Sequence, residues 1–243
     1  MIPKRLKKEP LLEAIWELRF TSDKGSVVEL LPGIIYQAFQ GEYAKIERLA
    51  VGSIPPLILQ QDEILRYAPS VKLECSPYAI QVGEHVVSLS CRRPYTGWEQ
   101  FKSKILDLCE KLQKTELITH PERFSLKYID VIDIAAQPSL EPLNIKLTLG
   151  NRSIEKNSVQ LRTENRDKDF IYIIQIVTDV HSSIATGESF DGLLCDIDTI
   201  YQKKDGDFWK DFLKNLDKAH DCSKDQFFSL LKESTIKLLE PEY

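Results

Sequence analysis

EPLLEAIWELRF, at Glu9–Phe20, is the stretch on which the predicted architecture depends. Apolar residues recur there at every second position, and the positions between them are mainly charged. Such alternation predicts a half-buried β-strand, because neighbouring side chains on a strand point to opposite faces. The apolar side consists of Leu12, Ala14, Trp16, Leu18 and Phe20, and the other side of Glu13, Ile15, Glu17 and Arg19. Since the apolar side requires a core, we expect the rest of the chain to pack around this strand.

The charged side of this strand is the first candidate binding surface. With a rise of roughly 3.3 Å per residue, Glu17 and Arg19 lie about 7 Å apart along the strand, close enough to form an ion pair. Glu13 and Glu17 lie about 13 Å apart, too far to share one metal ion. Two interpretations stay open. The three side chains are either a solvated charge cluster of small energetic value or part of a charged groove on an open sheet face.

A motif of the type P-x-x-E-A-x-x-E-L-R-F lies in this stretch, after a short basic segment, and consists of Pro10, Glu13, Ala14, Glu17, Leu18, Arg19 and Phe20. Three further stretches follow it along the chain: Leu31–Ile35, Arg123–Ile134 and Leu193–Asp198. In these motifs the chain resembles a sporadically distributed, uncharacterised prokaryotic protein family. No activity is established for that family, so the resemblance implies no catalytic residues.

The composition is that of a globular protein. The chain has 243 residues, of which 42% are hydrophobic and 28% charged, enough for one large domain or two small ones with a sizeable core. The net charge is −5 and the pI about 5.5, so no overall field attracts nucleic acid. The basic residues near the N-terminus predict a solvated tail; they are Lys4, Arg5, Lys7 and Lys8.

Two features indicate a cytoplasmic protein without a membrane contact. The basic N-terminus is not followed by the apolar region of a signal peptide, and the longest apolar run, Phe170–Val177, is far too short to span a bilayer. The five cysteines are widely spread and include no CxxC motif. This pattern favours reduced thiols in a reducing compartment over a disulfide framework.

The first half of the chain predicts a meander of short strands between two helices. Capping boxes at Ser26/Glu29 and Thr96/Glu99 predict helices at Val27–Phe39 and Gly97–Lys114. Pro32 predicts a kink in the first helix or a start at Leu31–Pro32. Turn residues separate the expected strands, which are Ile54–Leu59 (an edge strand, because of Pro55 and Pro56), Ile64–Tyr67, Val71–Cys75, Tyr78–Val82 and His85–Cys91.

The second half predicts further strands followed by two helices. Around the linker Ala135–Pro142, strands are expected at Arg123–Ile134, Leu143–Leu149, Ser158–Thr163, Phe170–Asp179 and Leu193–Tyr201. Asp207 predicts the cap of a helix that contains Phe208, Phe212, Leu216 and Ala219. Ser223 and Gln226 form a third capping box, which predicts a last helix at Phe227–Leu239.

These elements together predict an α+β fold built on antiparallel sheets with about four helices. Each half gives strands and then helices, which suggests two related units, 1–118 and 119–243. The strands of the two halves are equally compatible with one continuous domain.

Common catalytic and cofactor-binding motifs are missing from the sequence. Its ten glycines are scattered, with no GxxxxGK or GxGxxG loop to surround a phosphate. There is no GxSxG motif and no catalytic-cysteine signature. The four histidines stand apart, and His220-x-Cys222 has no second pair of ligands of the kind that zinc sites require. We therefore predict no cofactor and no catalytic residue.

Asp196 and Asp198 are the best candidate metal ligands. Both lie on one face of the predicted strand with Cα atoms about 7 Å apart, so both carboxylates can reach one Mg²⁺ ion. Metal-dependent nucleases add a third acid to such a pair, and the sequence does not identify one here. A solvated strand face is the alternative interpretation.

A second candidate binding site combines basic and aromatic residues at a strand–helix junction. It consists of Arg92, Arg93, Tyr95 and Trp98. Arginine and aromatic side chains stack on nucleic-acid bases, so the cluster predicts a small nucleic-acid contact. The acidic total of the chain limits that interpretation.

The sequence therefore favours a non-enzymatic, cytoplasmic binding or assembly protein that acts through sheet-face or sheet-edge contacts. Its expected partner is another protein or further copies of itself. The patchy distribution of the family that it resembles suggests an accessory role in a mobile or defence-type locus. Two alternatives remain: a metal-dependent nuclease or phosphoesterase that uses Asp196 and Asp198, and a nucleic-acid-binding module.

Overall fold

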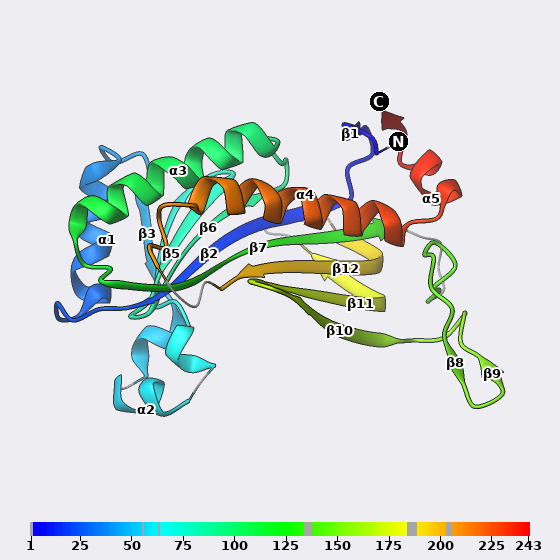
Figure 1. The fold of residues 1–243 in the computed structure, drawn as a ribbon, viewed down its shortest axis with the longest axis horizontal. Coiled ribbons are helices and arrows are strands. Elements are labelled where there is room, and N and C mark those ends of the chain that lie inside the picture. The colour runs from blue at the N-terminus through cyan, green and yellow to red at the C-terminus, as the bar shows by residue number, and fades with distance from the viewer. Residues whose placement is uncertain (1, 55, 63, 134–137, 184–188, 203–205) are drawn as a thin grey trace. The chain divides into compact units, whose positions relative to one another are not determined.

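The predicted α+β class with antiparallel sheet is confirmed by a computed structural model, which describes residues 2–54, 56–62, 64–133, 138–183, 189–202 and 206–243 (Figure 1). The chain forms two compact units. Unit 1 contains Met1–Leu12, Leu126–Ile200 and Phe212–Tyr243, and unit 2 contains Glu13–Ser125 and Tyr201–Asp211. The chain passes from one unit to the other four times, after Leu12, Ser125, Ile200 and Asp211.

Strand β2, Leu11–Thr21, is the extended segment that the alternation predicts. Ala14, Trp16, Leu18 and Phe20 are fully buried, and the charged residues between them are half-buried. Burying a side chain of this size stabilises the fold by about 1.5–3 kcal/mol. The apolar side of β2 therefore faces the core, and its charged side is partly exposed, as the sequence predicts.

The sheet of unit 2 has the strand order β7-β2-β6-β5-β4-β3. The bounds are His120–Asp133 for β7, Val86–Arg92 for β6, Tyr78–Val82 for β5, Val71–Cys75 for β4 and Lys45–Arg48 for β3. Each neighbouring pair from β2 to β3 is antiparallel, which confirms the predicted meander of β4, β5 and β6. β3 is the last strand in this order, and the sequence predicts no strand in its segment.

Helices α1 and α3 cover the apolar face of this sheet. α3, Trp98–Thr115, buries Phe101, Ile105, Leu108 and Leu112, close to the predicted helix Gly97–Lys114. α1, Val27–Ala38, begins at Val27 and includes Pro32, so the alternative start at Leu31–Pro32 is wrong. Figure 1 shows α3 above the strands of this unit and the short helix α2 below them.

The predicted capping boxes do not form. Ser26 makes no side-chain cap for α1; its hydroxyl donates instead to Glu84 at 3.0 Å. The Glu84 carboxylate accepts from the first helical backbone N–H groups, those of Val27 and Val28, both at 3.2 Å. A distant residue thus caps the helix. The Thr96 hydroxyl pairs with the Tyr78 hydroxyl at 2.6 Å, and the residue before α3 is Gly97, which has no side chain to cap with.

The segment between β3 and β4 also differs from the prediction. The expected strand Ile54–Leu59 is wrong, because Pro56–Gln61 forms helix α2 after a 3-10 turn, η1, at Ala50–Ser53; Pro55 lies outside the described residues. The expected strand Ile64–Tyr67 is wrong as well, since Leu65–Tyr67 is a second 3-10 turn, η2. Proline at the first helical position favours a helix start, and this effect prevails over the apolar run.

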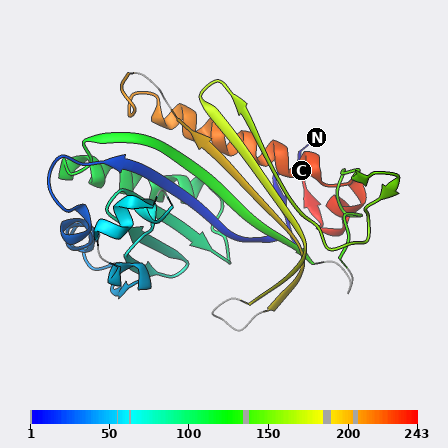
Figure 2. The same cartoon turned by 90° about the horizontal axis from the view of Figure 1, so that it is seen from below.

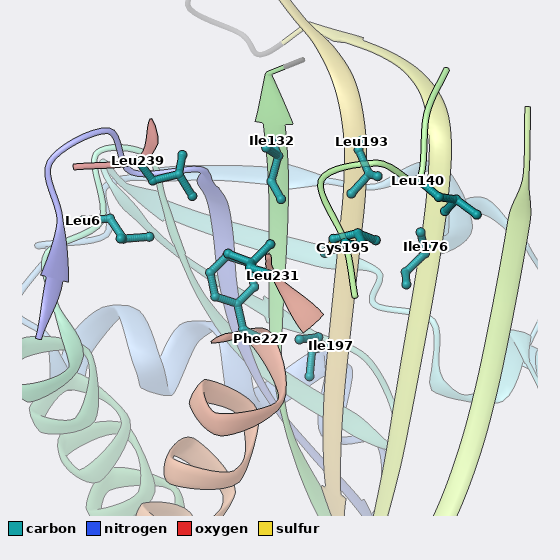
Figure 3. Close-up of a cluster of buried hydrophobic side chains, with 11 residues drawn as sticks. Leu6, Ile132, Leu140, Ile176, Leu193, Cys195, Ile197, Phe227, Leu231 and Leu239 are labelled. Atoms are coloured by element: carbon teal, nitrogen blue, oxygen red, sulfur yellow. The ribbon is translucent and has the colours of Figure 1, made fainter. Parts of the chain in front are cut away.

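Unit 1 contains strands in the order β10-β11-β12-β7. β10 is Gln160–Asp167, β11 is Phe170–Ser183 and β12 is Ser189–Tyr201, each overlapping a predicted strand. A buried cluster packs between these strands and helix α4, as Figure 3 shows, and it includes Ile132, Ile176, Leu193, Cys195, Ile197, Phe227 and Leu231. Leu140, within the predicted linker, is buried in the same cluster; Ala135–Gln137 lies outside the described residues.

Helix α4, Phe212–Leu230, is continuous where the sequence predicts a break between two helices. Ser223 does not cap a new helix. Its hydroxyl donates to the Ala219 carbonyl oxygen at 2.9 Å and pairs with the Thr199 hydroxyl at 2.8 Å. His220 and Cys222 therefore lie inside a helix. Asp207 accepts from the Trp209 backbone N–H at 2.9 Å, so it caps a turn that precedes α4.

The termini of the chain lie side by side in unit 1 (Figure 2). Strand β1, Arg5–Leu6, pairs antiparallel with β13, Pro241–Glu242, after the short helix α5, Glu233–Leu238. The four basic residues are exposed, as predicted, but the segment is not a free tail, because Leu6 is buried and β1 is held by backbone pairing. Of the predicted strand Leu143–Leu149, only a bridge at Leu143 and strand β8, Thr148–Leu149, form; β8 pairs with β9, Arg152–Ser153.

We expect Glu84→Ala to lower the free energy of unfolding by about 1–2 kcal/mol, because the substitution removes the acceptor for two N-terminal N–H groups of α1. Urea unfolding monitored by circular dichroism measures this change. Glu29→Ala is the matched control: it removes the acid of the predicted capping box, is exposed, and should change stability by less than about 0.5 kcal/mol. Equal effects of the two substitutions would contradict the observed cap.

Candidate binding surface

The side of the unit 2 sheet that α1 and α3 do not cover carries the charged residues of β2. The strand register places them in rows with polar residues of the other strands, such as Glu17 opposite Ser88, Ser88 opposite Gln81, Gln81 opposite Lys72 and Lys72 opposite Glu47. We call this surface the polar face. It contains Glu13, Ile15, Glu17, Arg19, Lys45, Glu47, Lys72, Glu74, Gln81, Ser88, Ser90 and Arg92.

Glu74 is the centre of one charge network on the polar face. Arg92 lies 3.2 Å from Glu74 and 3.4 Å from Glu13, so its guanidinium joins the acids of β4 and β2. Lys45 pairs with Glu74 at 2.7 Å, and Lys72 pairs with it too. Hydrogen bonds from Lys45 and Lys72 lower the pKa of Glu74 to about 2. The Glu74 carboxylate therefore stays ionised at any physiological pH.

Glu17 and Arg19 belong to a second network. They form the predicted ion pair at 2.7 Å, and Arg123 approaches the same Glu17 oxygen at 3.5 Å. The Arg19 guanidinium lies over the Tyr67 ring, 4.3 Å from its centroid, in a cation–π contact. Tyr67 donates to Glu122 at 2.9 Å, and burial raises the pKa of its hydroxyl. The Arg19 side chain is thus held between the Glu17 carboxylate and the Tyr67 ring.

Small polar side chains between the two networks are buried. Ser88 and Ser90 of β6 are both less than one-tenth exposed. Among the described residues the Ser90 hydroxyl has no hydrogen-bond partner. A buried hydroxyl without a partner costs about 1–3 kcal/mol. The polar face therefore contains a donor and acceptor that the chain itself does not satisfy.

The residues of the predicted nucleic-acid contact point to different environments. The Arg92 side chain joins the polar face and pairs with two carboxylates. The Tyr95 ring packs edge-on against buried Phe101, with ring centroids 6.1 Å apart. Arg93 is exposed in the connection that follows β6, and Trp98 is the first residue of α3. A base-stacking platform would require the Tyr95 ring to be free, and it is used in packing.

Asp196 and Asp198 lie together on one face of β12, as the sequence predicts, and a lysine lies beside them. The Lys127 ammonium is 3.4 Å from Asp196 and 3.9 Å from Asp198. The three side chains are between 15% and 32% exposed. Within the described ranges, no group of three His, Cys, Asp or Glu side chains is arranged to hold a metal ion. A cation bound by the two aspartates would have to compete with Lys127.

Asp130 is a buried acid that the sequence does not single out. It lies on β7, inside an apolar run, and is 6% exposed. Burial raises the pKa of its carboxyl to about 8, with repulsion from Glu9 and Asp196 adding to the effect. A lone acid in an apolar run gives no signal by itself, because its partners Glu9 and Asp196 are far away in the sequence.

The residues of His220-x-Cys222 contact different partners. His220 Nδ1 lies 2.8 Å from the Tyr128 hydroxyl, and the Cys222 thiol lies 3.8 Å from the Tyr172 hydroxyl. All five cysteines are free thiols. Both contacts join α4 to strands of unit 1, which is a structural role.

Comparison with known proteins gives no match: no protein-family model matches the chain, and no curated protein matches it. Across the described part of the chain, every helix is too short or too polar to cross a bilayer.

We expect Asp130→Asn to raise the melting temperature at pH 8–9 and to have little effect near pH 4. The carboxyl has a pKa of about 8 in the folded chain and of about 3.9 when unfolded. Between these values the folded chain keeps a proton that the unfolded chain releases, so rising pH destabilises the fold. Asparagine cannot ionise and removes this effect.

Thermal unfolding across this pH range, monitored by circular dichroism, tests the prediction. Asp133→Asn is the matched control, because Asp133 lies at the end of the same strand and is exposed. If the difference in melting temperature between wild type and Asp130→Asn does not grow with pH, the raised pKa is contradicted.

Proposed function

We propose that this chain is a cytoplasmic binding or assembly protein whose partner protein contacts the polar face. The observation that carries the proposal is the pair of charge networks around Glu74 and Glu17, which fixes acids and bases across the strands on the sheet face opposite α1 and α3. Side chains held in advance lose less conformational entropy on binding than free ones. The buried Ser90 hydroxyl adds a polar group that a water can satisfy.

The signs of the charges favour a protein partner over nucleic acid. Glu13, Arg92 and Glu74 alternate in sign, and so do Arg19, Glu17 and Arg123. A phosphate backbone requires a surface of one sign, whereas alternating charges suit a partner with a complementary pattern of its own. The net charge of −5 agrees with this choice.

The biological setting follows only from the family resemblance. The N-terminal motif from Pro10 to Phe20 is part of β2, so the residues of the resemblance include Glu13, Glu17 and Arg19 of the polar face. If the chain belongs to that sporadically distributed family, an accessory role in a mobile or defence-type locus is consistent with a partner-binding surface there.

A photo-crosslinking amino acid tests the proposed surface in living cells. Placed at Gln81, at the centre of the polar face, it should give a discrete adduct with a partner. Placed at Ser103, exposed on α3, it should give none. The adduct at Gln81 should disappear with Arg92→Glu, which reverses a charge in the network. Adducts at both positions, or at neither, would refute the proposal.

The alternative function is a metal-dependent nuclease or phosphoesterase that uses Asp196 and Asp198. The observation in its favour is that both carboxylates share one strand face and that Lys127 supplies an amine beside them. In such an enzyme the metal would polarise a phosphate and the ammonium would stabilise developing negative charge.

If this alternative holds, millimolar Mg²⁺ or Mn²⁺ should raise the melting temperature of the wild type, because a ligand of the folded state alone stabilises it. Asp196→Asn should abolish the increase together with any metal-dependent cleavage of DNA, RNA or a phosphoester. Asp167→Asn, at an exposed position on β10, is the control that should retain both. An unchanged wild-type melting temperature argues against the alternative.

A further inference from the structure

An apolar row crosses the unit 2 sheet and ends at an exposed residue. The register aligns Trp16, Leu89, Ile80, Leu73 and Ile46 on successive strands from β2 to β3. The first four are at most 1% exposed, whereas Ile46 is 50% exposed. The apolar row therefore continues to the edge of the sheet, but its last residue, Ile46, is left half exposed.

β3 has a free edge. It pairs with β4 on one side and is last in the strand order, and all four of its residues are exposed. An edge strand presents backbone N–H and C=O groups that can pair with another strand. The structure therefore offers main-chain hydrogen bonds and an apolar side chain at the same place.

The side chains of β3 select which strand can pair there. Lys45, Ile46 and Glu47 alternate in the order positive, apolar, negative. If a second β3 lies antiparallel and Ile46 faces its own copy, each Lys45 lies opposite a Glu47 and each Glu47 opposite a Lys45. Opposite charges across a strand pair stabilise it and like charges destabilise it. Charged edges usually prevent pairing with arbitrary strands, but this pattern is complementary to itself.

Helix α1 extends the apolar surface beside this edge. It packs on β4, which pairs with β3, and on β5, and it contacts α3. Leu30 and Ile34, one turn apart, are exposed on the flank that neither the sheet nor α3 covers. A helix that is apolar on its outer side as well as its inner side normally has a further partner.

We propose that two copies of this chain form a symmetric dimer by antiparallel pairing of β3 with β3, centred on Ile46, with the Leu30–Ile34 flank of α1 completing the contact. The proposal goes beyond the proposed function, because it concerns the sheet edge and a second copy, and it stands whether or not the polar face binds a partner.

The size of the contact explains why α1 has to take part. A stable interface buries roughly 800 Å² on each partner, more than a four-residue strand pair can supply alone. In the centred register Ile46 meets Ile46 on the side that α1 and α3 cover, because its neighbour Leu73 is buried there. Leu30 and Ile34 of α1 lie in the helix layer on this same side of the sheet.

β10, at the other end of the strand order that ends in β3, does not offer the same combination. Over its eight residues it exposes polar and charged side chains, and it has no exposed large apolar residue. β8 exposes Leu149, but it has only two residues and lacks the alternating charges of β3.

Sedimentation velocity over a range of concentrations tests the proposal. The wild type should form a dimer, and Ile46→Glu should raise the dimer dissociation constant at least about 10-fold, because it places like charges opposite each other on the symmetry axis. Ile34→Glu should weaken the dimer in the same direction. Leu213→Glu is the matched control, since Leu213 lies on α4 in unit 1 and is 48% exposed, close to the 50% of Ile46, and it should leave the dimer unchanged.

A disulfide experiment tests the register itself. In a Cys75→Ser, Cys222→Ser background, Ile46→Cys should oxidise to a covalent dimer, because opposite Cα atoms in an antiparallel pair lie about 4.5–5.5 Å apart. Arg48→Cys should not, because residue 48 faces residue 44 of the other copy and the two introduced thiols lie about 13 Å apart along the strand.

Three results would overturn the proposal. The first is a wild-type protein that stays monomeric at hundreds of micromolar. The second is a dimer that Ile46→Glu does not weaken, and the third is a covalent dimer with Arg48→Cys but not with Ile46→Cys. If the pure protein is monomeric and Ile46→Glu abolishes a complex with a different protein, the edge binds a foreign strand instead of a second copy.

Discussion

The burial of one side of β2 is the constraint on which the rest of unit 2 depends. Trp16 has no exposed surface, and its row continues through Leu89 and Ile80 to Leu73, each on a neighbouring strand. Because strand side chains alternate, fixing Trp16 inward fixes Glu17 outward, and a slip of one residue would exchange the two sides. The register of these four strands therefore follows from one buried apolar row, and the polar face is the necessary result on the other side of the same strands.

The sequence predicts the features that depend on near neighbours. The alternation in β2, the hairpins of β4 to β6 and the apolar stripe of α3 are periodic patterns, and each is found close to its predicted position. The helix caps show where such patterns fail. Ser26 and Ser223 have the right spacing to a Glu or Gln, yet Glu84 caps α1 and Ser223 bonds within α4. A local motif shows which backbone groups a side chain can reach. In the folded chain, a different hydrogen-bond partner can replace the expected one.

The same distinction applies to the candidate sites. The pair Glu17–Arg19 could be predicted from its spacing on one strand, and so could the common face of Asp196 and Asp198. The partners that set their chemistry could not, because Arg123 and Lys127 come from β7. Glu74 and Asp130 show this most clearly. Each is an ordinary acid in the sequence, but Lys45 of the neighbouring strand and Lys72 of the same strand lower the pKa of Glu74 to about 2, and burial raises the pKa of Asp130 to about 8.

The apolar row and the polar face have different relations to the free edge of β3. The covered side ends with Ile46 half exposed, which leaves apolar surface in water, whereas the charges on the other side are already paired within the chain, as Lys45 is with Glu74. Hydrophobic burial drives association without directing it, and the charges set the register and the partner. In the proposed dimer the antiparallel copy covers Ile46 and places each Lys45 opposite a Glu47, whereas a strand with like charges at these positions would be repelled. The alternation that begins in β2 thus gives both the core of unit 2 and the specificity of its last strand.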